Sequence, residues 1–404
     1  MKKDSILLLF KGSAGEVDWI LPIADKLSKD LNIYTHFRSK KAFEILKYNK
    51  DLFDKWKKIN NGFYISSIYN NFGWKVINKI LNKFLNKKFE FLNKKINNIK
   101  YLKDFFLNKQ KNKFFKYIFS ESSYPNGWYE SAKKNKDRSL IIHYPHSPFI
   151  SFQKKKFKNN YSLNGDILLL NGIEEINRWS NFINKKKIYT LGIPRYDINW
   201  VKKILNNKKR IHTKNFIISI PYKSFFNLYP SKSKILKIHL ENLFRTILSI
   251  KNVIIYIKLH PRLKCDNTIE IIKKLKKTYK NKIIITNHHL FLLANNSDLC
   301  ISPTNTSTIL DFIYFNVPTV QYGKPFKQID GKENENNSLP KKGISLIYND
   351  INYLSKIIKN ILKKKRTKIW NYQQKTFKKY FKHKDSINRI IKLIDTEYKK
   401  RYDN

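Results

Sequence analysis

Two segments in the second half of the chain carry residues that could bind a phosphate. The first is Lys258-Leu-His260-Pro261-Arg262, which ends an apolar, β-branched run beginning at Asn252. Because Pro261 has no N–H and disfavours helix for the residue before it, the run is expected to be a strand that ends there. Two cations and an imidazole would then lie at a strand's carboxyl end, where open α/β sheets place their ligands. A satisfied core imidazole is the alternative for His260.

The second segment runs from Ser297 to Thr308 and leads from a short apolar strand into a hydroxyl-rich turn and a helix. Thr304 or Thr306 is expected to cap that helix. The free N–H groups of a helix start also bind anions, and the two roles are compatible. We therefore expect a phosphate contact from the hydroxyl side chains of this turn: Ser302, Thr304, Thr306, Ser307 and Thr308.

The first half of the chain offers candidates for proton transfer. Gly12-Ser13-Ala14-Gly15-Glu16 follows the opening apolar run, and its glycines permit a tight turn before a helix. Glu16 is then either a first-turn carboxylate favoured by the helix dipole or a general base. Asp18 is a weaker candidate for the same role. The dinucleotide-binding fingerprint is not matched, because its third glycine is missing.

A turn with two histidines, His143-Tyr-Pro-His146-Ser-Pro, follows another apolar run. A metal site is disfavoured, because no cysteine or carboxylate stands nearby to complete it. His143 is expected to end the strand. His146 lies in the turn itself and is the better candidate for proton transfer or acceptor contact, with a purely structural role as the alternative.

The motif Gly192-Ile-Pro194-Arg195-Tyr-Asp197 closes the first half. Pro194 fixes a turn, and Arg195 and Asp197 could pair with each other to hold a domain junction. The alternative is that Gly192 and Arg195 contact a bound phosphate or act at a hinge.

Apolar runs alternate with helical patterns along the chain, which is typical of a largely parallel α/β protein. Helices are expected in most gaps between the runs, among them Val17–Leu31, Ile235–Ile250, Ile269–Tyr279, Thr306–Phe315 and Ile351–Leu362. The runs predict strands near Ile6–Phe10, Ile33–His36, Tyr117–Ser120, Leu140–His143, Asp166–Leu170, Ile188–Leu191, Phe216–Ile220, Val253–Leu259, Lys282–Thr286, Leu299–Ser302 and Thr319–Tyr322. We expect two doubly wound parallel-sheet domains that face each other across a cleft. Residues 1–203 form the first domain and residues 204–385 the second, and a C-terminal helix or tail follows at 386–404. The basic segment at about 72–115 reads as two long helices, which either pack on the core or lie on a membrane surface.

The chain has 404 residues with 82 Lys+Arg against 30 Asp+Glu, a formal net charge of +52. The excess is mostly Lys, spread along the sequence and mixed with Asn and Ile, so an AT-rich genome is one explanation and a functional charge is the other. In either case the charge attracts anionic substrates and membranes, and it does not indicate one particular partner. Two cysteines with no metal-type spacing fit a reducing compartment. We expect a cytoplasmic protein, with any membrane contact peripheral at the inner face of the plasma membrane, because no apolar run approaches ~20 residues.

These motifs together resemble those of GT-B glycosyltransferases of the envelope-polysaccharide type. More narrowly, they resemble CDP-glycerol glycerophosphotransferases, bacterial sialyltransferases and Kdo transferases. In that group a His-Pro dipeptide after a second-domain strand and a later Ser/Thr cluster hold the donor's phosphates, as His260-Pro261 and Ser302 to Thr308 would here. Ser13-Ala-Gly15-Glu16 resembles the Ser-x-Gly-Glu of Kdo transferases, whose Glu is the proposed base. His146 lies where glycerophosphotransferases carry His-Gly, but Ser147 replaces the glycine.

The resemblance implies a GT-B-like transferase that moves a sugar or polyol phosphate from a CMP- or CDP-type donor to a cell-envelope polysaccharide or lipid-linked acceptor. Glu16, His146 and His260 would be catalytic, with Ser13, Gly15 and His143 on the acceptor side. Lys258 and Arg262 would join the hydroxyl turn in holding the donor. No cofactor and no metal are expected, because no Asp-x-Asp motif is present.

Three alternatives remain open at this point. A UDP-sugar 2-epimerase shares the fold but needs a larger set of acidic residues. A basic nucleic-acid-binding protein would show a localised basic face with interleaved aromatic residues. A non-catalytic relative would bind the nucleotide-sugar without turning it over.

Overall fold

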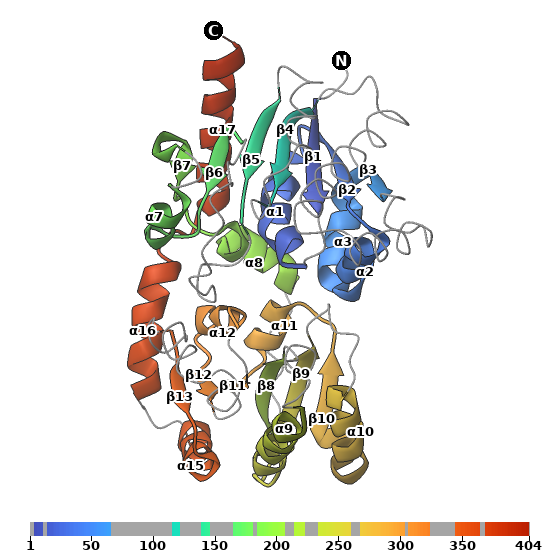
Figure 1. The fold of residues 1–404 in the computed structure, drawn as a ribbon, viewed down its shortest axis with the longest axis vertical. Helices are drawn as coiled ribbons and strands as arrows, with labels where there is room; N and C mark the ends of the chain where they lie inside the picture. The colour runs from blue at the N-terminus through green and yellow to red at the C-terminus, as the bar shows by residue number, and fades with distance from the viewer. Residues whose placement is uncertain are drawn as a thin grey trace, which may run out of the picture. The chain divides into compact units, whose positions relative to one another are not determined.

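The computed structural model describes residues 4–10, 14–65, 115–121, 139–145, 165–180, 184–206, 214–222, 233–259, 267–303, 306–323, 344–363 and 368–403. They form two compact units, each built on its own sheet (Figure 1). Unit 1 takes the described residues of Met1–Ser147, Lys156–Trp200 and His383–Asn404, and unit 2 those of Val201–Lys382.

The sheet of unit 1 has the order β3-β2-β1-β4-β5-β6-β7, and all of its pairs are parallel. Its strands are β1 Ser5–Phe10, β2 Asn32–Phe37, β3 Asn60–Ile65, β4 Phe115–Ser120, β5 Leu140–His143, β6 Ile167–Leu169 and β7 Ile188–Tyr189. β1, β5 and β6 are buried along their whole length, as expected for apolar strands covered on both faces. The strand order reverses between β1 and β4, which makes this the switch point of unit 1.

Helices and 3₁₀ turns complete unit 1: α1 Ala14–Leu27, α2 Lys40–Tyr48, α3 Lys50–Ile59, η1 Ile173–Glu175, α7 Ile176–Trp179, η2 Lys185–Lys187, η3 Pro194–Tyr196 and α17 Ser386–Tyr402. The helix α8 Ile198–Leu205 begins in unit 1 and continues into unit 2, because the division falls after Trp200. α1 packs on β1 and β4 and contacts α3, η3 and α17.

The C-terminal helix α17 belongs to unit 1 and is bonded to strands distant in the sequence. The hydroxyl of Tyr117 on β4 donates to Asp395, Arg401 pairs with Asp166, and the Tyr402 hydroxyl donates to the Ser139 carbonyl. Residues 386–404 are therefore part of the first unit rather than a separate tail.

The sheet of unit 2 has the order β10-β9-β8-β11-β12-β13, again with every pair parallel. Its strands are β8 Phe216–Tyr222, β9 Val253–Leu259, β10 Ile283–Thr286, β11 Leu299–Ser302, β12 Thr319–Tyr322 and β13 Leu346–Tyr348. The order reverses between β8 and β11, so the switch point lies beside Ser302.

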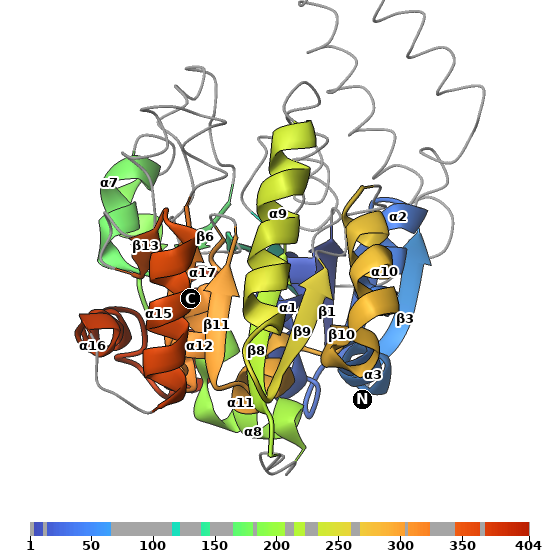
Figure 2. The same ribbon diagram turned by 90° about the horizontal axis from the view of Figure 1, so that it is seen from below.

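The two faces of this sheet differ in chemistry. An aliphatic core joins alternate strand residues to α9 Ser233–Leu248, α10 Asn267–Tyr279 and α15 Ile351–Leu362, which lie side by side in Figure 2. α11 Leu290–Asn295, α12 Ile309–Tyr314 and α16 Lys368–Tyr380 contact one another in series, and α12 and α16 also contact β12. Strand residues that alternate with the aliphatic ones are polar at several positions, including Ser219, Ser302 and Gln321.

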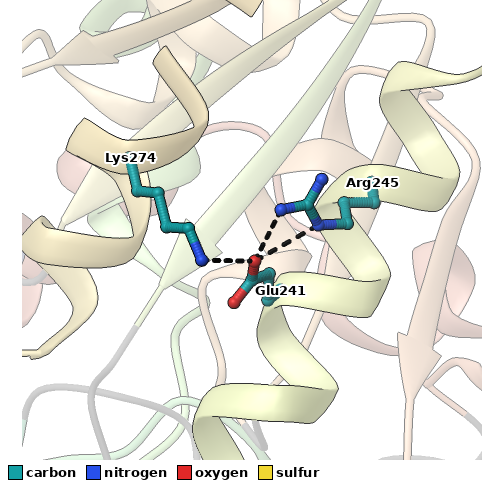
Figure 3. Close-up of polar contacts among 3 residues, drawn as sticks. All are labelled: Glu241, Arg245 and Lys274. Atoms are coloured by element: carbon teal, nitrogen blue, oxygen red, sulfur yellow. Dashed lines mark hydrogen bonds and ion pairs between the residues drawn. The ribbon is translucent and has the colours of Figure 1, made fainter. Parts of the chain in front are cut away.

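A polar contact ties two helices of the aliphatic face together at the surface. Glu241 on α9 accepts hydrogen bonds from Arg245, one turn later, and from Lys274 on α10 (Figure 3). These two cations lower the pKa of the Glu241 carboxyl.

The predicted α/β class with two parallel-sheet units is confirmed. The strands predicted within the described residues occur where expected, and the helix at Ile351–Leu362 has the predicted bounds. The predictions missed the edge strands β3 and β13 and the helices α2 and α3. The expected basic helices at about 72–115 lie outside the described residues up to residue 114, and Phe115 begins β4.

Gly192→Ala is expected to destabilise unit 1, because Gly192 has φ +94° and a Cβ there would lie 2.3 Å from Ser386 Oγ and 2.8 Å from His383 Cβ. Left-handed strain and the clash should together cost about 2–4 kcal/mol. The measurement is the urea midpoint by tryptophan fluorescence. Gly62→Ala is the control, since its Cβ would meet only the Tyr34 ring, at 3.2 Å. Equal midpoints for the two variants would contradict the assignment.

Candidate functional site

The carboxyl edge of unit 2 gathers polar side chains from neighbouring strands. Lys258 on β9 pairs in register with Pro221 on β8, and Ser302 on β11 pairs with Gln321 on β12. β9 and β11 flank β8, so Lys258 and Ser302 are two strand spacings apart, about 10 Å. Lys258 is only 7% exposed and Ser302 is fully buried. A cation and a hydroxyl at this spacing could contact adjacent phosphates of one nucleotide.

The hydroxyl turn after β11 is arranged differently from the sequence-based expectation. α12 begins at Ile309 and its N-cap is Thr308, which makes no side-chain cap bond. The Thr306 hydroxyl accepts from the Thr308 N–H at 3.3 Å and lies 3.0 Å from the Thr308 hydroxyl. The prediction that Thr306 caps the helix is therefore wrong: Thr306 closes a short turn before it. Thr306, Ser307 and Thr308 are all half-buried, so their hydroxyls remain within reach of a ligand.

Several predicted donor residues lie outside the described residues, namely His260, Arg262 and Thr304. Gln321 was not predicted. It is 2% exposed, and its Oε1 has no hydrogen-bond partner among the residues that the structure describes. The strand-end rule that selected Ser302 would also have selected Gln321. Cys300, on the same strand as Ser302, is an inert candidate, because burial and then Asp311 raise the pKa of its thiol well above the usual value.

The switch point of unit 1 holds the predicted base. α1 begins at Ala14, so Gly15 and Glu16 lie in its first turn, and Glu16 is 1% exposed. Asp18 forms an ion pair with Arg195, with 2.9 Å between Oδ2 and Nε and both side chains buried. Because a neighbouring guanidinium favours the charged carboxylate, Asp18 is a poor proton acceptor. The structure thus favours Glu16 over Asp18.

The Gly192–Asp197 motif forms the turn that supports this helix. Arg195 does not pair with Asp197 as the sequence suggested; it pairs with Asp18 and lies over the Trp19 ring, with its Cζ 5.3 Å from the ring centroid. Asp197 accepts from the N–H groups of Asn199 and Ile387, at 3.0 and 3.1 Å. Both acidic and basic side chains of the motif therefore hold the fold of unit 1.

His143 ends β5 as predicted and is fully buried. Its Nδ1 lies 3.5 Å from the hydroxyl of Ser120, its register partner on β4. Its ring also fills the space above Gly165, where a Cβ would lie 2.1 Å from the imidazole Cδ2. These contacts give His143 a packing role in the sheet of unit 1. His146 and Ser13 lie outside the described residues.

Two buried carboxylates at this edge escaped the sequence predictions. Glu121 directly follows β4 and Glu175 closes the η1 turn after β6, and both are buried. The Tyr144 hydroxyl donates to the Gly192 carbonyl at 3.2 Å. Burial, and secondly Glu175, raise the pKa of Tyr144, so it remains a proton donor. Unit 1 therefore has more acidic residues after its strands than were predicted from the sequence.

Within the described residues, no group of three or more His, Cys, Asp or Glu side chains could hold a metal ion. Over the same ranges, no helix is long and apolar enough to cross a bilayer.

The sequence matches no known protein family, and no curated protein resembles it closely enough to count as a relative. Solved structures do resemble it over nearly its whole length. The wall teichoic acid polymerase TagF is 13% identical, with a TM-score of 0.60 over 99% of this chain and 90% of that one. The UDP-GlcNAc 2-epimerase of Methanocaldococcus jannaschii is 15% identical, with a TM-score of 0.55 over 97% and 99% of the two chains. Staphylococcus aureus MnaA with UDP is 11% identical, with a TM-score of 0.57 over 96% and 95%.

The chain has the GT-B fold. At these identities the likeness establishes the architecture of the two units and leaves the reaction to be argued from the residues.

Gly165→Ala is expected to displace the His143 imidazole and lower the free energy of unfolding by about 2–4 kcal/mol, because the new Cβ would lie 2.1 Å from Cδ2 of a fully buried ring. The measurement is the thermal midpoint of this variant, of His143→Ala and of the double variant. The double variant should be more stable than the sum of the single losses predicts. Additive losses would contradict the contact.

Proposed function

We propose that this protein is a transferase that moves a sugar or polyol phosphate from a nucleotide-activated donor to a cell-envelope glycan or lipid-linked acceptor. The observation that carries the proposal is the polar carboxyl edge of unit 2. There Lys258 and Ser302 lie about two strand spacings apart, beside a turn with three half-buried hydroxyl residues. Such an edge suits the adjacent charges of a nucleotide's phosphates.

In this mechanism unit 2 holds the leaving nucleotide. Lys258, His260 and Arg262 offset the negative charge that grows on the departing phosphate, and the hydroxyls of Ser302, Thr304, Thr306, Ser307 and Thr308 donate hydrogen bonds to it. Preorganised donors and cations at such a position stabilise the transition state more than the ground state. The charge of the leaving group is met by side chains, without a metal ion or other cofactor.

Unit 1 supplies the base. Glu16 lies in the first turn of α1, where the helix dipole favours the ionised carboxylate, the form that a general base must have before it accepts a proton. Removal of the proton from an acceptor hydroxyl by Glu16, or by His146, lets that oxygen attack the donor as the bond to the nucleotide breaks. The high net charge of +52 would draw both the anionic donor and an anionic membrane surface, where lipid-linked acceptors reside.

The choice of CMP, CDP or UDP belongs to the proposal. The resemblance to CDP-glycerol glycerophosphotransferases and the similarity in fold to a wall teichoic acid polymerase favour a cytidine-type donor. Structures of the same fold with UDP and with UDP-glucose make a uridine donor the next choice.

A second function, UDP-sugar 2-epimerisation, is favoured by one observation. Glu16, Glu121 and Glu175 give unit 1 three buried carboxylates that follow different strands. Proton removal and return at a sugar carbon, or elimination and re-addition of the nucleotide, requires acidic groups of this kind. Several proteins with the same fold are UDP-GlcNAc 2-epimerases.

Incubation with CDP-glycerol, a CMP-sugar or UDP-GlcNAc, each with and without an envelope-glycan or lipid-linked acceptor, separates the two functions. A transferase releases the nucleotide in proportion to product and needs the acceptor. An epimerase converts UDP-GlcNAc to its 2-epimer with no acceptor present. Chromatography of the nucleotides measures both. No turnover of any donor under either condition would contradict the enzyme assignment.

His260→Ala should lower kcat/KM by about 100-fold or more, because the leaving phosphate loses a cationic or hydrogen-bonding partner. His239→Ala is the matched control, since His239 is on α9, which covers the aliphatic face of the same unit. The control should stay within about twofold of the wild type in kcat/KM, as expected for a change remote from the reacting groups. Near-normal turnover by His260→Ala would contradict the proposal that His260 contacts the leaving phosphate of the donor.

A further inference from the structure

Asn171 follows β6 at the carboxyl edge of unit 1 and is 6% exposed. Its Oδ1 accepts from the Trp19 indole N–H at 2.6 Å, and its Nδ2–H donates to the Pro145 carbonyl at 3.4 Å. Trp19 is on α1, and Pro145 follows β5. One side chain therefore joins two segments that come from different parts of the sequence.

The chemistry of the two partners requires a side chain with both a donor and an acceptor, and the Asn171 amide has both. An indole N–H can only donate and a backbone carbonyl can only accept, so the residue between them must offer one acceptor and one donor. Asp would lack the donor, and Leu would lack both groups. The direction of the Trp19 bond also fixes which end of the Asn171 amide faces Pro145.

Trp19 is itself held on its other side. The Arg195 guanidinium lies over its ring and pairs with Asp18, while the Tyr196 ring meets it edge-on at 6.4 Å between centroids. Trp19 is one helical turn after Glu16, and residues three apart lie on the same side of a helix. The orientation of Trp19 therefore sets the orientation of the turn that carries Glu16.

We propose that Asn171 is a positioning residue that fixes the first turns of α1, and thus Glu16, relative to the chain segment after β5, which leads into His146. This inference rests on the proposed function, since it takes Glu16 or His146 as the base. It adds a residue that touches no substrate and acts through the two candidate bases.

The test measures kcat and donor KM for Asn171→Ala, for Trp19→Phe and for the double variant, with the donor that the wild type turns over. Misplacement of a base by a fraction of an ångström should lower kcat by about 10–100-fold for Asn171→Ala. Donor KM should stay within about twofold, because the donor is held by residues of unit 2. Trp19→Phe keeps the ring over Arg195 and loses one bond, so its loss should be smaller.

The double variant should have the kcat of Asn171→Ala, because both changes break the same link. Asn60→Ala is the matched control. Asn60 also belongs to a series of hydrogen bonds that starts at a tryptophan of unit 1. The Trp56 indole donates to the Thr35 hydroxyl at 2.9 Å, and that hydroxyl donates to Asn60 Oδ1 at 2.8 Å. Its thermal midpoint should fall as that of Asn171→Ala does, while its kcat remains within about twofold of the wild type.

The outcomes separate the two claims. No donor turnover by the wild type contradicts the proposed function. If the wild type turns over a donor, three results contradict the positioning role alone. They are an unchanged kcat in Asn171→Ala, additive losses of kcat in the double variant, and equal losses of kcat in Asn171→Ala and Asn60→Ala. If Asn171→Ala fails to fold, Trp19→Phe is the test, and it should lower kcat while donor KM stays within about twofold. An unchanged kcat in Trp19→Phe overturns the inference.

Discussion

Parallel pairing is the constraint on which the chemistry of both units depends. Every strand pair among the described residues is parallel, so within each unit all strands end at one edge. Side chains that are far apart in the sequence meet there because the ladder brings their strands into register. Lys258, Ser302 and Gln321 lie along one edge of unit 2 for this reason, as do the residues after β1, β4, β5 and β6 in unit 1.

The contacts that each of these side chains makes within its unit distinguish them further. His143 and Cys300 have reactive groups, but both are enclosed, and each serves the packing of its strand. Asp18 and Arg195 neutralise each other inside unit 1, which is how a buried charged pair is tolerated. Glu16, in the first turn of α1, and the half-buried hydroxyls before α12 are the groups to which the proposed function assigns a chemical role.

Local sequence was sufficient to predict most strands, since apolar β-branched runs such as Val253–Leu259 form buried strands in almost any parallel sheet. It failed for β3, whose opening Asn-Asn-Gly has low strand propensity and which forms only by pairing with β2. The same limit applies to the site. Glu121 stands directly after an apolar strand and could have been found by the strand-end rule, whereas the partner of Arg195 could not.

The hydrogen bonds of Asn171 show why contacts inside the site could not be predicted from the sequence. Its partners Trp19 and Pro145 are 152 and 26 residues away. The strand-end rule could have marked Asn171 itself, because it follows an apolar strand. Its two partners could not be predicted, because only the assembled sheet brings the three residues together. Sequence reasoning therefore finds reactive groups more readily than it finds their supports.

The central claim is that the carboxyl edge of unit 2 holds the nucleotide, and hydrogen–deuterium exchange with saturating CDP or UDP tests it most directly. The claim predicts slower exchange in the segments that follow β9 and β11, around residues 259–266 and 302–308, and unchanged exchange in α9, α10 and α15. Protection confined to unit 1, or no protection at a concentration that saturates binding, would contradict it.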